Sequence, residues 1–124
     1  TQFDAVSGRS GYYRGQKLLI LVRRGAVATV AVTGRERRHA ALLYDPAHWN
    51  DSNQYRVSDG ESAVTFKACR QGETAPVGGP ARAMTQFNGG FVVAGVRCLA
   101  LHLFVRGDGR PIPVRLSFGA GRCA

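Results

Sequence analysis

The sequence predicts an all-β protein, an antiparallel two-sheet sandwich of the immunoglobulin-like or a related Greek-key type. Three dipeptides with the chemistry of a tight hairpin turn stand between apolar segments, namely Asp59-Gly60, Asn88-Gly89 and Asp108-Gly109. Apolar and polar residues alternate in short runs, and a helical period of apolar residues nowhere persists over three turns. About eight to ten short strands are expected, and a closed β-barrel is the alternative arrangement for them.

The Asp108-Gly109 dipeptide predicts the last hairpin together with its register. With a two-residue turn at this position, the facing pairs would be Leu99–Phe118, Leu101–Leu116 and Leu103–Val114. Because apolar residues meet apolar residues in each pair, the turn chemistry and the hydrophobic pattern agree on this hairpin.

The other two dipeptides predict two further hairpins. Around Asp59-Gly60 the facing pairs would be Tyr55–Val64 and Val57–Ser62, which gives a half-buried pair of strands. Around Asn88-Gly89, segment 81–87 would return as segment 90–95, and the glycines that flank this second segment indicate bulges or bends.

Three more strands are expected in the first part of the chain. Segments 17–22 and 26–32 predict a hairpin closed by Arg24-Gly25 or by a three-residue bulged loop. Residues 39–44, HAALLY, supply another strand. The longer segment 34–43 is also the nearest approach to a helical pattern, which the following Asp-Pro pair would end, but we expect it to be extended.

Length and charge restrict the kind of protein. The 124 residues predict a single domain spanning residues 1–124, and the longest purely apolar run, residues 18–22, is far too short for a transmembrane segment. The net charge is +9, and fifteen of the seventeen basic residues are arginine. Since these are scattered apart from the cluster RERRH at residues 35–39, we attribute the skew to coding bias and expect only a weak, non-specific attraction to polyanions.

The cysteines indicate an oxidising compartment. Cys69, Cys98 and Cys123 contain no C-x-x-C pair, so a disulfide is a better use for them than a metal cluster. We expect a Cys69–Cys98 disulfide, with Cys123 as the alternative partner, because Cys123 lies four positions beyond the residue expected to face Cys98. One thiol is left over. The protein is therefore expected to be a monomer or a thiol-linked homo-oligomer, secreted or associated with the cell envelope, whose signal peptide has been removed.

Patterns for catalysis are weak. The sequence has no G-x-S-x-G motif, and its glycine-rich fragments lack the strand-to-helix setting of phosphate loops. His48 is flanked by Asp45 and Asp51 at three-residue spacings, which is a weak pattern for zinc or a similar cation. Residues 50–54, NDSNQ, offer oxygen ligands for calcium but equally suit turns. We expect no cofactor, no metal and no catalytic residue.

The best candidates for recognition lie in the connection at residues 44–61. It gathers aromatic rings, amides and a histidine, groups that can stack on sugar faces or bases and donate hydrogen bonds to a ligand. The predicted binding residues are Tyr44, His48, Trp49, Asn50, Asn53 and Tyr55. The alternative is that most of these rings cap the core at the ends of strands.

Three segments resemble one group of proteins. VTFKAC (Val64 to Cys69), TQFNGGFVVAGVRC (Thr85 to Cys98) and SFGAGRC (Ser117 to Cys123) are similar to segments of small secreted or lipid-anchored proteins of actinobacteria, for which no activity is known. The resemblance covers mainly the second half of the chain. It implies a cell-envelope setting and a source with arginine-rich coding, and it carries over no catalytic residue.

These observations favour a non-catalytic secreted or cell-envelope domain that acts in binding or scaffolding. A glycan or an envelope protein is the expected partner. Two alternatives belong to other classes of protein. The first is a metal-dependent hydrolase that uses His48 with Asp45 and Asp51. The second is a structural subunit that self-assembles through the surplus thiol or an exposed sheet edge.

Overall fold

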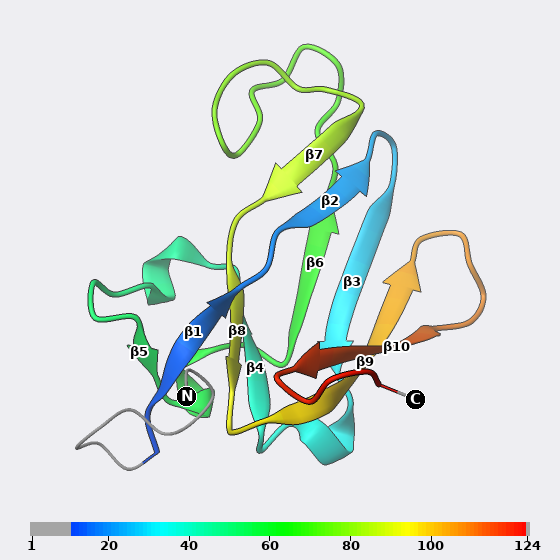
Figure 1. Cartoon of the computed structure of the whole chain (residues 1–124). Coiled ribbons are helices and arrows are strands. Elements are labelled where there is room, and N and C mark those ends of the chain that lie inside the picture. Colours follow the sequence, from blue (N-terminus) through cyan, green and yellow to red (C-terminus); the bar gives the residue numbers. More distant parts are fainter. Residues whose placement is uncertain (1–10, 124) are drawn as a thin grey trace.

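The computed structural model describes residues 11–123 and shows ten β-strands and three short 3₁₀ helices in that range (Figure 1). The strands are β1 (Tyr13–Lys17), β2 (Ile20–Arg23), β3 (Val27–Val32), β4 (Ala40–Leu43), β5 (Gln54–Tyr55), β6 (Ala63–Lys67), β7 (Met84–Phe87), β8 (Gly90–Val93), β9 (Arg97–Val105) and β10 (Ile112–Phe118). The 3₁₀ helices are η1 (Gly34–Glu36), η2 (Pro46–His48) and η3 (Val57–Asp59). None of the helices among these residues is long and apolar enough to span a membrane.

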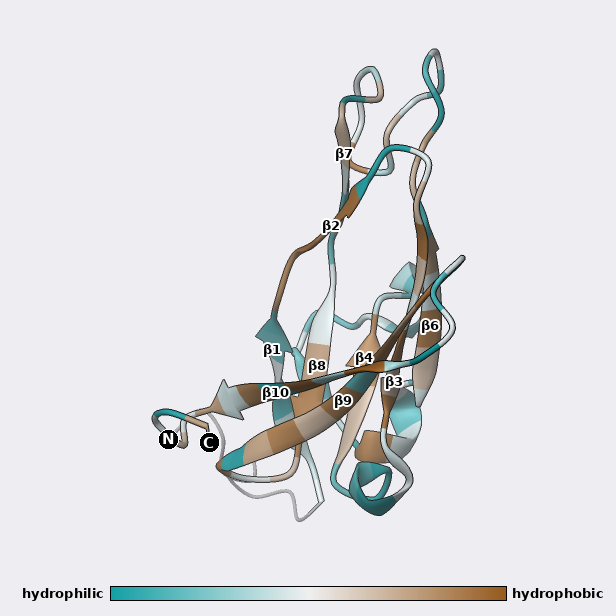
Figure 2. Cartoon of the chain, turned by 90° about the vertical axis from the view of Figure 1, so that its right-hand side faces the viewer, coloured by the Kyte–Doolittle hydropathy of each residue, from teal (hydrophilic) through white to brown (hydrophobic). Residues whose placement is uncertain are grey.

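Every strand pairing is antiparallel, and the strands form two four-stranded sheets and one two-stranded ribbon. The strand order is β4-β8-β1-β5 in the first sheet and β10-β9-β3-β6 in the second, and the ribbon is β2-β7. Figure 2 shows β1 and β8 on one side of the molecule and β3 and β6 on the other. The predicted all-β sandwich is confirmed, and the sheets are not closed into the alternative barrel.

The main core lies between the two sheets, because the strands of both turn alternate apolar side chains inward. Its largest fully buried side chains include Phe91 and Leu42 from the first sheet and Leu99 from the second. Aromatic rings fill its centre, where the rings of Tyr44 and Phe66 meet edge-on with centroids 5.0 Å apart. Burying each side chain of this size contributes about 1.5–3 kcal/mol.

The strands β4 and β8 are buried on both faces, not only on the face toward the main core. On their outer face Leu43 and Val92 pack with Tyr55, and partly buried Tyr13 and Val57 lie against the same small cluster. Tyr55 and Val57 belong to the connection at residues 44–61. This connection is therefore a second layer over the outer face of the first sheet.

The segments β1–β2 and β7–β8 are two long bent strands that run antiparallel to each other. The register of β1 against β8 continues without a slip into that of β2 against β7, and at the bend the Leu18 N–H donates to the Gly89 carbonyl (3.1 Å). The predicted hairpin at Asn88-Gly89 is therefore wrong, although a bend is present. A Cβ at Gly90 would lie 2.1 Å from the Gln16 carbonyl oxygen, so the glycine serves a close backbone approach.

The last hairpin, β9–β10, is present as predicted, but its register is shifted by two residues. The facing pairs are Leu99–Leu116, Leu101–Val114 and Leu103–Ile112. The chain reverses over residues 106–111, where Gly107 has φ 98° and the Asp108 N–H donates to the Val105 carbonyl (3.0 Å), so Asp108-Gly109 is not the centre of a two-residue turn. A slip of two residues leaves every side chain on the same face of the sheet, so the alternation of apolar residues cannot distinguish the two registers.

The predicted hairpin at Asp59-Gly60 is wrong. Residues 57–59 form η3, which is held by the Asp59 carboxylate as it accepts the Arg56 backbone N–H (2.8 Å). The flanking strands have other partners: β5 pairs with β1, and β6 pairs with β3. A Cβ at Gly60 would lie 2.6 Å from the Leu42 carbonyl oxygen, so this glycine also serves a close approach rather than a reversal.

At Arg24-Gly25 the predicted turn is present, but the predicted pairing is wrong. Gly25 has φ 82°, and the Ala26 N–H donates to the Arg23 carbonyl (2.9 Å). The chain crosses here from the ribbon to the second sheet, because β2 pairs with β7 while β3 pairs with β6 and β9. The predicted strand at residues 39–44 is present as β4. The expectation that segment 34–43 is extended throughout is wrong, because residues 34–36 form η1 and residues 37–39 form a turn.

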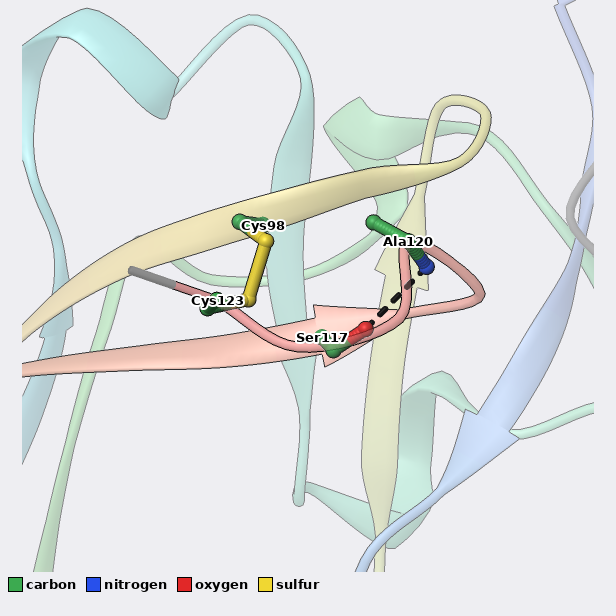
Figure 3. The surroundings of a disulfide bond; sticks show 4 residues. All are labelled: Cys98, Ser117, Ala120 and Cys123. Atoms are coloured by element: carbon green, nitrogen blue, oxygen red, sulfur yellow. Dashed lines mark hydrogen bonds between the residues drawn. A yellow bond between two sulfur atoms is a disulfide. The ribbon is translucent and has the colours of Figure 1, made fainter.

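The disulfide joins Cys98 to Cys123, with a Cα–Cα distance of 5.8 Å, and Cys69 is a free thiol (Figure 3). The predicted Cys69–Cys98 bridge is wrong, and the alternative partner Cys123 is correct. After β10 the chain turns back on itself, and the Ala120 N–H donates to the Ser117 hydroxyl (3.0 Å). The two cysteines are separated by 25 positions in the sequence. In the chain-entropy model, closing a loop of this length stabilises the fold by about 3–4 kcal/mol.

Candidate functional site

A groove of about 410 Å³ lies beside β1, where the connection 44–61 approaches the first sheet. Its walls come from residues 15–17 of β1, residues 88–90 at the bend before β8, Leu43, and a set of side chains from the connection. The connection contributes Trp49, Asn50, Asn53 and Tyr55. Among the described residues that line the groove, none is a carboxylate, a histidine, a serine or a cysteine.

Short-range hydrogen bonds hold the connection in one shape. At the start of η2, the Asp45 carboxylate accepts the Ala47 N–H (2.9 Å). The Asn50 side chain then closes the next turn, because its Oδ1 accepts the Ser52 hydroxyl (2.8 Å) and its Nδ2 donates to the Gln54 carbonyl (3.1 Å). The Asn50 side chain therefore mainly stabilises the loop, because most of its hydrogen-bonding capacity is used within the connection.

Asn53 joins the connection to β1. Its φ of 53° lies in the left-handed region, which asparagine tolerates better than most residues. Its Nδ2 donates to the Gly15 carbonyl (3.3 Å), and its own carbonyl accepts the Gly15 N–H (3.1 Å). A Cβ at Gly15 would lie 2.6 Å from Asn53 Oδ1 and 3.0 Å from the Tyr55 ring. Only glycine at position 15 allows this approach without a shift.

Trp49 is the aromatic surface of the groove. The side chain is 43% exposed, although the indole N–H donates to the Leu43 carbonyl (3.0 Å). Next to it, the Asn50 N–H donates to the Tyr55 hydroxyl (3.1 Å), which fixes the neighbouring ring. An indole that is anchored at its polar edge and still accessible can stack on the apolar face of a ligand without first losing freedom.

Lys17 supplies the positive charge of the groove. The residue is exposed, and among residues 11–123 no carboxylate lies within 4.0 Å of its ammonium group. Across the bend, Asn88 accepts a hydrogen bond from the Gln86 amide (3.0 Å). Neither Lys17 nor Asn88 was predicted as a binding residue from the sequence. Lys17 lies at the start of an apolar segment and Asn88 in a predicted turn, and both are far from the connection in sequence.

The structure brings four of the six predicted binding residues together and separates the other two. The four that line the groove are Trp49, Asn50, Asn53 and Tyr55. Tyr44 lies in the main core, where its hydroxyl donates to the Leu18 carbonyl (2.6 Å) and burial raises the pKa of the phenol. His48 lies outside the groove lining, beside two carboxylates.

The imidazole of His48 lies between Asp45 and Glu61. Its Nε2 is 3.9 Å from a carboxylate oxygen of Asp45, and its Nδ1 is 3.9 Å from one of Glu61. One potential ligand atom from each of the three residues lies within 4.8 Å of the others, and all three side chains are exposed. Glu61 takes the place of the predicted Asp51, because its backbone bridges to Leu42 on β4. Zinc would require bonds of about 2 Å, so the side chains would have to draw inward.

No protein family, curated protein or solved structure matches this chain. The fold and the groove therefore carry the functional argument. They define an antiparallel β-sandwich with one disulfide and an open groove that combines an anchored indole, amides and a lysine.

Proposed function

We propose that this protein is a non-catalytic carbohydrate-binding domain that acts outside the cytoplasm, secreted or in the cell envelope. The proposal rests on Trp49, whose indole lines the groove, is tied to the Leu43 carbonyl and remains 43% exposed. The axial hydrogens of a sugar ring form an apolar face that fits such an indole. Lys17 and the side-chain amides of Asn53 and Asn88 provide partners for hydroxyl or acidic groups of the sugar.

The chemistry of the groove favours binding over cleavage. Hydrolysis of a glycosidic bond needs two carboxyl groups at about 5–10 Å from each other. The lining residues within the described part of the chain include no carboxylate. The Cys98–Cys123 disulfide supports an oxidising location, because such bonds persist mainly outside the cytoplasm.

Binding to insoluble polysaccharides tests the proposal. The protein is sedimented with chitin, cellulose, xylan and peptidoglycan, and we expect it to bind at least one of them. Trp49→Ala should weaken that binding by about tenfold or more, since base or sugar stacking on an aromatic ring contributes roughly 1–3 kcal/mol, and Trp49→Phe should retain part of it. The melting temperature should change by no more than a few degrees, because the ring lies outside the core.

Phe104→Ala is the matched control, because Phe104 on β9 is exposed to a similar degree (45%) but does not line the groove. This variant should bind like the wild type. Equal losses for Trp49→Ala and Phe104→Ala, or no binding to any of the polysaccharides, would contradict a sugar site at the groove.

A divalent cation at Asp45, His48 and Glu61, as in a metal-dependent hydrolase, is a second candidate. It is favoured by the approach of one imidazole and two carboxylates to within 4.8 Å. Isothermal titration with Zn²⁺ tests it. A saturable heat that His48→Ala abolishes and Asp51→Ala leaves unchanged would support it, whereas no heat, or equal effects of both variants, would remove it.

A further inference from the structure

The β2–β7 ribbon has one face toward the core and one toward solvent. Val22 and Thr85 face each other on the inner side and are almost fully buried, and Ile20 and Phe87 pack against the core beside them. The alternate positions form the outer face of the ribbon. These positions are Leu21, Arg23, Met84 and Gln86, together with the exposed Leu19 directly before β2.

Three of these five positions, Leu19, Leu21 and Met84, are apolar, although an antiparallel pair normally presents polar residues to water on its outer face. Leu21 is 57% exposed, Leu19 45% and Met84 43%. Together with Val77 in the adjoining loop, they are four of the eight large hydrophobic side chains exposed within the described residues. In Figure 2 the ribbon stands at the upper end of the molecule, with hydrophobic colour along β2. An apolar patch of this kind marks an interaction surface.

The end of the ribbon is basic. Arg23 is paired with Met84, and the Arg24 N–H donates to the Ala83 carbonyl (2.8 Å), which brings Arg82 alongside. All three arginines are exposed. Across residues 19–26 and 67–87 there are five basic side chains and one acidic side chain, Glu73. The Glu73 carboxylate already accepts the Arg70 backbone N–H.

We propose that the outer face of the ribbon docks on an anionic lipid bilayer. Leu19, Leu21 and Met84 would enter the boundary between headgroups and acyl chains, while the arginines at the ribbon end would contact lipid phosphates. Charge complementarity selects this partner. A second copy of the chain is disfavoured, because each copy carries a net charge of +9.

A protein partner fits the outer face less well than a bilayer does. Leucine is under-represented among the residues that dominate protein interfaces, where tryptophan and tyrosine are enriched. The outer face has no aromatic residue. Aliphatic side chains with flanking arginines instead match the two terms of membrane-surface binding, which are burial of apolar area and attraction to acidic headgroups.

Sedimentation with lipid vesicles tests the proposal. The wild type should bind vesicles of equal parts phosphatidylglycerol and phosphatidylcholine. Its affinity for vesicles of phosphatidylcholine alone should be at least tenfold lower. Leu21→Gln should weaken binding by about tenfold, because it removes an apolar side chain that docking would bury. Arg23→Gln combined with Arg24→Gln should weaken it by roughly fivefold for each charge.

Two controls distinguish binding through this face from non-specific effects of charge and hydrophobicity. Val96→Gln removes an apolar side chain that is 50% exposed in the β8–β9 loop, and Arg106→Gln with Arg110→Gln removes two charges from the β9–β10 loop. Both should bind anionic vesicles within about twofold of wild type, a difference far smaller than one lost contact would cause. Unchanged melting curves would show that every variant is folded.

Three results would overturn the proposal. They are no sedimentation with the anionic vesicles, equal losses from the Arg23/Arg24 and Arg106/Arg110 pairs, and an unaltered affinity for Leu21→Gln. A dimer in light scattering that Leu21→Gln abolishes, without vesicle binding, would assign the face to a second copy instead. Binding of polyglutamate but not of anionic vesicles would assign it to an acidic protein.

Discussion

Two antiparallel strand pairs in this molecule carry apolar residues on their outward faces, and only one of them is covered. On β4–β8, Ala41, Leu43 and Val92 are at most 4% exposed, because Tyr55 packs over them. On β2–β7, the corresponding outward residues Leu21 and Met84 are 57% and 43% exposed. Both pairs turn apolar side chains outward, although the ribbon also presents Arg23 and Gln86. The pairs also differ in the neighbouring connection, since residues 44–61 follow β4 whereas residues 68–83 precede β7.

The connections differ in where their hydrogen bonds go. Residues 44–61 return to the sheet, because Asn53 bonds to Gly15 on β1 and Glu61 bridges to Leu42 on β4. The connection at residues 68–83 bonds largely to itself, with a bridge between Thr74 and Pro80. The first connection thus becomes the cover of a small core and a wall of the groove. The second leaves the ribbon face open.

Removing the cover should have the largest effect. Tyr55→Ala deletes the ring that buries the outer face of β4–β8, and we expect it to lower the free energy of unfolding by about 3–4 kcal/mol. Leu21→Ala on the open face should change it by less than about 0.5 kcal/mol. Urea unfolding of both variants measures the difference. Similar values for the two would show that the covered and open faces are not distinct.

A smaller effect should follow when the attachment of the cover is disturbed. In Gly15→Ala the new Cβ would meet Asn53 Oδ1 at 2.6 Å and the Tyr55 ring at 3.0 Å. We expect a loss of about 1–3 kcal/mol, because the side chains must shift.

Gly25→Ala at the ribbon turn gives the matched comparison for Gly15→Ala. There the left-handed φ of 82°, and not a clash, opposes the substitution, so the loss should be about 1 kcal/mol. Only Gly15→Ala should also alter the exposure of the groove, which tryptophan fluorescence of Trp49 reports. A fluorescence change in Gly25→Ala would contradict this assignment.

The smallest effect should be a pH dependence of the free energy of unfolding that arises from Asp59 in the connection 44–61. The Arg56 backbone N–H, followed by the Arg56 guanidinium, lowers the pKa of Asp59 below its usual 3.8. A carboxyl whose pKa is lowered by folding stabilises the protein fully above about pH 4, and this contribution is lost as the pH falls through the folded-state pKa. Asp59→Asn should therefore cost about 0.5–1 kcal/mol at pH 7.

The cost of Asp59→Asn should disappear at the acid end, where the wild-type carboxyl is itself protonated. Urea unfolding of both proteins between pH 7 and about pH 2 measures this convergence. A constant difference across that range would show that the Asp59 charge does not stabilise η3.

The candidate site was predictable to the extent that its residues are neighbours in sequence. Trp49, Asn50, Asn53 and Tyr55 fall in one connection, and aromatic rings next to amides indicate a recognition loop. Lys17 and Asn88 reach the same groove from strands that pair through the register of β1 against β8. Residues that meet only through strand pairing share no local pattern, so nothing in the sequence links Lys17 and Asn88 to the connection.

The amino-acid sequence by itself determined the all-β class, the positions of most strands and the faces that their side chains take, because these follow from local chemistry with a period of two residues. The tertiary structure decided which strands pair, in what register, and therefore which cysteines meet. The same period explains the limit, since a slip of two residues preserves every face. Glycines add to it, because a glycine that permits a reversal and one that admits a neighbouring backbone, as at Gly60 and Gly90, are identical in the sequence.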